Sequence, residues 1–147
     1  MRELADAGRI RAFMKALGER AEADCRVYFT GGASAVLEGW RRETVDADLL
    51  LVPDSDRLLQ RIPELKETLH INVELASPAH FIPELTGWED RSRFIERIGQ
   101  VSFYHYDFCA QALAKVERGD QPHRLSAGPR ERRGSRPSSL RPAAHCA

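Results

Sequence analysis

The stretch from residue 27 to residue 52 constrains the fold of this chain most. It reads VYFTGGASAVLEGWRRETVDADLLLV, so a glycine pair and a run of small residues join two apolar segments. The apolar, β-branched and aromatic residues at 27–29 and 44–52 predict two strands, and Ala33–Leu37 predicts a short helix after the glycines. This order of elements indicates an α/β or α+β fold, with a mixed β-sheet flanked by helices.

The second of these strands carries two carboxylates, Asp46 and Asp48, at alternate positions. Alternate residues of an extended strand share one face, so both acids point one way while Ala47 and Leu49 point the other. Two adjacent carboxylates repel each other, and the repulsion is relieved when one takes up a proton or when a divalent cation binds both. A hard oxygen pair suits Mg²⁺, so this strand is a candidate metal site.

The glycine pair is a candidate anion-binding site. Gly31 and Gly32 have no Cβ, so the backbone at this turn can approach a ligand, and Ser34 adds a hydroxyl close by. Unpaired amide groups at the start of the next helix attract an anion. The structural alternative, a tight turn with close helix packing, explains the same glycines without a ligand.

The flanking sequence predicts the elements around this unit. A helix over 3–22 is predicted by apolar residues at spacings of three and four, namely Leu4, Ile10, Phe13, Met14, Leu17 and Ala21. Further elements are a helix from 56 that breaks at Pro63, a strand over 70–75, a hairpin over 93–106 around Gly99, and a helix over 108–118. We expect that last helix to be capped by Asp107, to end at Gly119 and to bury Cys109, Ala112, Leu113 and Val116.

The strand over 70–75 alternates apolar and polar residues, and Glu74 is on its polar face. A strand-borne carboxylate is ordinarily a solvated surface group. Beside a strand that bears Asp46 and Asp48, however, Glu74 would complete a cluster of three carboxylates.

The neutral net charge hides two unlike segments. Residues 1–120 hold 16 Lys and Arg against 21 Asp and Glu, whereas residues 121–147 hold six Arg against one Glu. An acidic body is unlike a general nucleic-acid-binding surface, although it is compatible with a local phosphate pocket. The second segment holds four of the eight prolines and no aromatic residue, so we expect one domain over 1–120 and a disordered basic tail after it.

The chain carries no signal for a membrane. Its apolar runs are shorter than the about 18 residues of a membrane span, and its N-terminus lacks the apolar core of a signal peptide. The cysteines at 25, 109 and 146 are odd in number, widely spaced and without a metal-ligand pattern, so we expect reduced thiols. These features predict a cytoplasmic protein.

Three motifs together resemble the minimal nucleotidyltransferase superfamily. They are the Gly31-Gly32 turn after a strand, the Asp46-x-Asp48 strand, and Glu74 between apolar residues of a further strand. The wider context, with YDFCAQALAKVERG over 106–119, is similar to a bacterial subgroup of uncharacterised nucleotidyltransferases. That subgroup lies near the nucleotidyltransferases of toxin–antitoxin and abortive-infection systems, and the resemblance covers residues 27–120.

The resemblance implies a role for each of these groups. The residues that would ligate Mg²⁺ are Asp46, Asp48 and Glu74, of which the last would alternatively draw the proton from an acceptor hydroxyl. The residues that would hold the triphosphate are Gly31, Gly32 and Ser34, with Lys115 reaching a phosphate.

Two functions of different class follow. The first is an enzyme that transfers a nucleoside monophosphate from a nucleoside triphosphate to a hydroxyl on RNA, protein or a small molecule. The second is a binding module of the same fold, with weak or no catalysis, that holds a cognate toxin or antitoxin. A third interpretation treats Asp46 and Asp48 as ordinary acids on an α/β domain without a metal.

The C-terminal segment departs from the subgroup, whose chains continue after the Lys-x-x-Arg helix with an Asp-Leu-x-Asp-type helix. Here the chain enters PHRLSAGPR instead. The bases CAT CGA CTT AGC GCA GGT CCG CG would encode residues 123–130 as written, and read one base later they spell Ile-Asp-Leu-Ala-Gln-Val-Arg. We hypothesise that a frameshift replaced the helix with an out-of-frame tail.

Sequencing of the gene tests this hypothesis. The expected result is that the frame one base later continues as a helix-forming sequence. An immediate stop codon in that frame, or a translation without helical periodicity, would contradict the frameshift.

Overall fold

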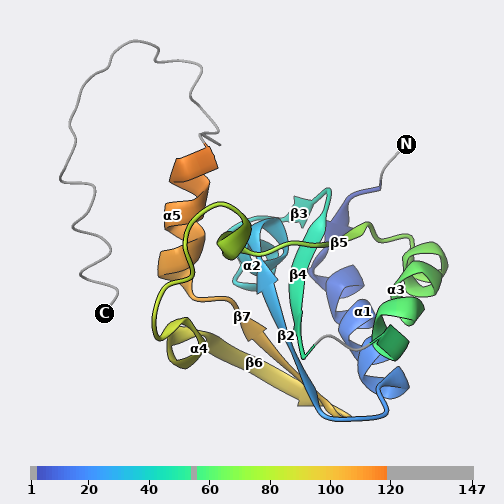
Figure 1. The fold of residues 1–147 in the computed structure, drawn as a ribbon. Coiled ribbons are helices and arrows are strands. Elements are labelled where there is room, and N and C mark those ends of the chain that lie inside the picture. The colour runs from blue at the N-terminus through green and yellow to red at the C-terminus, as the bar shows by residue number, and fades with distance from the viewer. Residues whose placement is uncertain (1–2, 54–55, 119–147) are drawn as a thin grey trace, which may run out of the picture.

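Five strands form one mixed sheet in the order β5-β4-β2-β7-β6 (Figure 1). The computed structural model describes residues 3–53 and 56–118. The strands of this sheet are β2 (Cys25–Thr30), β4 (Ala47–Val52), β5 (Val73–Leu75), β6 (Arg93–Ile98) and β7 (Val101–His105). A separate pair of two-residue strands consists of β1 (Ala5–Asp6) and β3 (Glu43–Thr44).

Helices accompany both faces of the sheet. The helical elements are α1 (Ala7–Arg20), α2 (Gly31–Leu37), α3 (Asp56–Leu69), the 3₁₀ helix η1 (Pro78–His80), α4 (Trp88–Arg91) and α5 (Phe108–Arg118). In Figure 1, α1 and α3 lie together on one side of the sheet and α5 lies on the other. This arrangement confirms the predicted mixed sheet flanked by helices.

Strand β2 is the central strand, antiparallel to β4 and parallel to β7. Strand β4 pairs in parallel with the edge strand β5, and β7 pairs antiparallel with the edge strand β6. The predicted hairpin around Gly99 is confirmed, and Gly99 has a φ of 60°, a left-handed conformation that glycine adopts without strain.

Consecutive residues of the inner strands contribute to two different cores. The core beneath α1, α2 and α3 includes the strand residues Val27, Phe29, Leu49, Leu51 and Phe103. The core on the opposite face consists of Tyr28, Trp88, Tyr106 and Ala110, with Leu50, Val52 and Tyr104 packed against it. The period of two along each strand therefore covers the sheet on both faces, which explains why β4 carries an uninterrupted run of leucines.

Helix α1 has the predicted apolar stripe but begins later than expected. Ile10 and Leu17 are fully buried, whereas Leu4 precedes the helix and is 49% exposed. The carboxylate of Asp6 accepts a hydrogen bond from the backbone N–H of Arg9 at 2.9 Å. This N-cap begins the helix after Asp6, because it supplies a partner for an otherwise unpaired amide.

The predicted strand over 44–52 is interrupted. Strand β3 ends at Thr44 and β4 begins at Ala47, and the two belong to different sheets. Thr44 pairs with Ala5 in the small sheet, and its hydroxyl donates to the backbone oxygen of Asp46 at 3.1 Å. Asp46 therefore lies in the connection that leads into β4.

Helix α3 runs through Pro63 without a break, so the expected break there was wrong. A proline inside a helix removes one N–H donor and costs about 3 kcal/mol. Pro63 itself is exposed. The buried residues Leu58, Ile62 and Leu65 lie before and after it along the helix. Burial of each of these side chains contributes about 1.5–3 kcal/mol, so together they outweigh the cost.

The predicted inner face of α5 was wrong in part. Asp107 caps the helix as expected, because its carboxylate accepts from the backbone N–H of Cys109 at 3.1 Å. The buried residues are Cys109, Ala110 and Ala114, whereas Val116 is 61% exposed. Leu75, on the apolar face of the strand predicted over 70–75, is also exposed because β5 is a short edge strand.

Two expectations lie outside the described residues. They are the helix stop at Gly119 and the tail over 121–147. Cys25 is a buried free thiol, as predicted, whereas Cys109 is disulfide-bonded, so the expectation of a reduced thiol was wrong at that position. Within the described part of the chain, every helix is too short or too polar to cross a membrane.

Helix α1 meets the β6–β7 hairpin at Gly18. A Cβ on Gly18 would lie 2.5 Å from the backbone oxygen of Ile98, and a Cβ on Gly99 would lie 2.5 Å from the backbone oxygen of Gly18. Backbone atoms in a packed interior yield less than the end of a flexible side chain does. This crossing therefore requires glycine.

We predict that Gly18→Ala lowers the free energy of unfolding by about 1–3 kcal/mol, because overpacking exceeds the gain in helix propensity. Urea unfolding followed by circular dichroism measures the change. The matched control is Gly8→Ala in the same helix, where a Cβ would approach Asp6 no closer than 3.5 Å, so stability should be kept or raised. Equal effects of both substitutions would contradict the packing argument.

Candidate functional site

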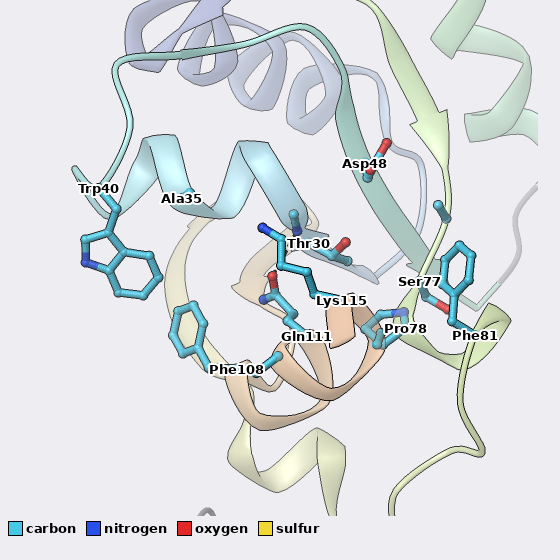
Figure 2. Close-up of a pocket in the computed structure, with 14 residues that line it drawn as sticks. Thr30, Ala35, Trp40, Asp48, Ser77, Pro78, Phe81, Phe108, Gln111 and Lys115 are labelled. Carbon is cyan, nitrogen blue, oxygen red and sulfur yellow. Dashed lines mark hydrogen bonds between the residues drawn. The ribbon is translucent and has the colours of Figure 1, made fainter. Parts of the chain in front are cut away.

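A cavity of about 370 Å³ lies where β2 ends and β4 begins. Its walls come from the β2–α2 junction, from β4, from the segment after β5 and from α5 (Figure 2). Three of the predicted site residues line it, namely Gly31, Asp48 and Lys115. The fold thus brings together a glycine, a carboxylate and an ammonium group from three distant segments.

Asp48 and Glu74 are neighbours across β4 and β5. The parallel register pairs Asp48 with Glu74, and the antiparallel register on the other side pairs Asp48 with Thr30. Directly paired residues project from the same face of a sheet. Asp48 is half-buried in the cavity wall and Glu74 is exposed beside it, so two carboxylates meet at the border between cavity and solvent.

Asp46 lies next to this pair and outside the cavity lining. The side-chain amide of Asn72 donates to Oδ1 of Asp46, and the backbone N–H of Ala47 donates to the carbonyl of Asn72 at 2.8 Å. Within residues 3–53 and 56–118, no three acidic, histidine or cysteine side chains are grouped so that they could hold a metal ion. Asp48 and Glu74 are therefore paired across two strands, Asp46 lies in the connection before β4, and the three predicted acids do not form an assembled metal centre in this conformation.

The two glycines differ in what they do. Gly31 has a φ of 61° and is the first residue of α2, directly after β2. Its backbone N–H donates to Oε1 of Gln111 at 2.9 Å, and a Cβ there would lie 3.5 Å from Oδ2 of Asp48. A Cβ on Gly32 would overlap the side chain of Thr44, so Gly32 is required by the packing of α2 against β3.

Ser34 lies behind the cavity in a buried polar network. Its side-chain oxygen is 2.7 Å from Nδ1 of His105, and Nε2 of His105 is 3.0 Å from the carboxylate of Glu38. Arg93 approaches the same carboxylate at 3.3 Å. With an exposed fraction of 1%, the Ser34 side chain contacts His105 and does not line the cavity.

Hydrogen bonding in this network is satisfied by a neutral imidazole. An ionised carboxylate only accepts, so Nε2 of His105 carries the hydrogen that reaches Glu38, and Nδ1 accepts from the hydroxyl of Ser34. Burial lowers the pKa of His105 below its ordinary value of 6.5, and the charges of Arg93 and Arg11 act in the same direction, while Glu38 opposes them.

Helix α5 supplies Gln111 and Lys115, which share one helical face because they are four residues apart. Gln111 connects three segments, since it accepts from Gly31, donates to the carbonyl of Tyr106 at 2.7 Å and approaches Ser34 at 3.4 Å. Lys115 is exposed, and Figure 2 shows its side chain extending across the middle of the cavity.

Sequence reasoning did not identify Gln111 or the network of Ser34. The four-residue spacing from Lys115 was a usable signal for Gln111. The contact between Ser34 and His105 joins residues 71 positions apart, and no local pattern in the chain indicates it.

The chemistry that this site supports is inferred from its residues and their positions. No protein-family model, curated protein or solved structure matches the chain. Carboxylates such as Asp48 and Glu74 are the ligands that Mg²⁺ prefers, and Mg²⁺ commonly binds through one or two of them together with water and phosphate oxygens. The residues that could contact a divalent cation here are therefore Asp48 and Glu74, and Lys115 is the cationic side chain that lines the same cavity.

We predict that acidification destabilises the protein through His105. Because burial lowers the folded-state pKa, the unfolded state takes up the proton first, so stability is lost as the pH falls below about 6.5 towards the folded-state pKa. Urea unfolding at several pH values should show a smaller acid-dependent loss in His105→Gln than in the wild type. His80→Gln, at an exposed position, is the control and should keep the wild-type pH dependence. A pH dependence of stability in His105→Gln equal to that of the wild type would show that His105 is not the group responsible.

Proposed function

We propose that this protein is a Mg²⁺-dependent nucleotidyltransferase that acts in the cytoplasm. It would move a nucleoside monophosphate from a nucleoside triphosphate to a hydroxyl on RNA, protein or a small molecule. The observation that carries the proposal is that Gly31, Asp48 and Lys115 line the same cavity, with Glu74 paired to Asp48 at its border.

The carboxylates supply the metal site of the proposal. Asp48 and Glu74 would hold Mg²⁺ between them, and Asp46, oriented by Asn72, would be the third oxygen donor. When bound, Mg²⁺ neutralises charge that develops on the phosphoryl oxygens during in-line transfer. Such transfer depends on position and electrostatics more than on covalent chemistry, and the site contains residues suited to both.

The remaining residues bind the substrate and move a proton. Lys115 extends over the cavity and would contact the phosphates, next to the backbone of Gly31. The acceptor oxygen would attack the α-phosphorus. The bond between the α-phosphorus and the oxygen that bridges it to the β-phosphorus would break, and pyrophosphate would leave. Glu74, exposed at the border of the cavity, would take the proton of the acceptor hydroxyl if it does not ligate Mg²⁺.

The alternative function is that of a binding module in a toxin–antitoxin-type pair, with weak or no catalysis. Two observations favour it. Among the described residues the acids are not assembled into a metal-binding group, and the N–H of Gly31 is already bonded to Gln111. Gly32 packs against Thr44 and Ser34 contacts His105, so neither of these predicted phosphate-binding residues lines the cavity.

The test is transfer of label from α-phosphate-labelled nucleoside triphosphates, in the presence of Mg²⁺, to total RNA or to a cell lysate. We expect transfer by the wild type, and a loss of at least about 100-fold in Asp48→Asn and in Glu74→Gln, because each removes charge that stabilises the transition state. Asp46→Asn and chelation of Mg²⁺ should also reduce transfer. Asp90→Asn, at an exposed position on α4, is the matched control and should retain full transfer.

Two results would contradict the enzyme. Absence of transfer from any of the four nucleotides, by a protein that circular dichroism shows to be folded, would favour the binding module. Transfer that persists in Asp48→Asn would show that the activity does not depend on this site.

A further inference from the structure

Trp40 is a large aromatic side chain at one end of the cavity. It lines the cavity, yet 64% of its surface is exposed. The other tryptophan of the chain, Trp88, is 8% exposed and stacks on Tyr106 with ring centroids 4.4 Å apart. An indole left mostly in water beside a cavity is available to cover the flat surface of a ligand.

The backbone holds Trp40 in place. Gly39 has a φ of 84°, which turns the chain sharply after α2, and nothing lies within 4 Å of a Cβ built on it. The backbone N–H of Trp40 donates to the carbonyl of Ala35 at 2.9 Å. The indole also contacts Phe108 of α5, with ring centroids 5.3 Å apart and planes tilted by 52°. The ring is therefore oriented before any ligand arrives.

The two ends of the cavity differ in polarity. Trp40 and Phe108 form one end, Asp48 lies towards the other end, and Lys115 extends between them (Figure 2). A ligand that matches this order has a flat apolar ring at one end, an anionic group in the middle, and a cation-binding group beyond it. A nucleoside triphosphate with Mg²⁺ has these groups in this order.

We propose that the nucleobase of the bound nucleotide stacks on Trp40, with Phe108 closing the edge of the ring, while the phosphates extend past Lys115 towards Asp48. The inference rests on the proposed function, because it places the substrate of that reaction. It adds Trp40 as a residue that binds the base and takes no part in the transfer itself. Stacking of this kind is tolerant of base identity because every base has a π-face.

The test measures binding and not turnover, by titration of the full-length protein with MgATP in a calorimeter. We expect Trp40→Leu to weaken MgATP binding by about tenfold or more, and Trp40→Phe to bind nearly as the wild type does because it keeps a ring. Inorganic tripolyphosphate with Mg²⁺ has no ring to stack, so it should bind equally to all three proteins. Because Trp40 is largely exposed, its replacement leaves both cores intact.

The matched control is Phe81→Leu, since Phe81 is an aromatic residue of the same cavity, 42% exposed, at the Asp48 end. It should bind MgATP as the wild type does. Fluorescence gives a second readout, because MgATP should quench tryptophan emission in the wild type and not in Trp40→Leu, where only buried Trp88 emits.

Three results would overturn the inference: equal affinity of Trp40→Leu and the wild type for MgATP, weakening by Phe81→Leu in place of Trp40→Leu, or no binding of MgATP at all. Its failure is distinguishable from failure of the proposed function. MgATP binding that depends on Trp40 without any label transfer would contradict the enzyme alone, whereas label transfer with Trp40-independent binding would contradict the stacking alone.

Discussion

The antiparallel pairing of β2 with β4 is the interaction on which the rest of the structure depends. It sets Thr30, the last residue of β2, opposite Asp48, so that Gly31 begins the next helix beside that carboxylate. A slip of one residue would turn Asp48 towards the main core, because side chains alternate between the faces of a strand. The pairing of Phe29 with Leu49, both fully buried, opposes such a slip. Packing of Phe29 and Leu49 on one face of the sheet thus fixes the position of Asp48 on the other face.

Helix α5 is held firmly where it begins and is exposed further along. Asp107, which is 3% exposed, accepts two hydrogen bonds from the guanidinium of Arg91, at 3.0 and 2.8 Å. Removal of Arg91 would leave the buried Asp107 carboxylate without its cation, which is destabilising. One turn later, Gln111 ties the helix to Gly31. The wall of the cavity is therefore fixed by polar contacts, while exposed Lys115 can adjust its long side chain to a ligand.

The junction between β2 and α2 separates a buried polar network from the open cavity. Behind α2, His105 joins Ser34 to Glu38 in a buried environment where a neutral ring meets every requirement for hydrogen bonds. In front of it, the cavity carries Asp48 at one end and the rings of Trp40 and Phe108 at the other. In the proposed reaction the network stabilises the helix that carries Gly31, and the cavity residues contact the nucleotide.

Local patterns in the sequence determined most elements of the fold, including the stripe of α1, the hairpin of β6 and β7 and the cap of α5 by Asp107. Each depends on side chains within one or two turns of one another, so the order of residues is sufficient to predict it. The sequence correctly placed Asp48 on a strand, whereas Asp46, expected on the same strand, lies in the connection before β4. The tertiary structure alone decided that α3 continues through Pro63, that Ser34 bonds His105 and that the amide of Gly31 meets Gln111. These outcomes depend on burial and hydrogen bonding between distant segments, whose free energies outweigh local preference once the chain has folded.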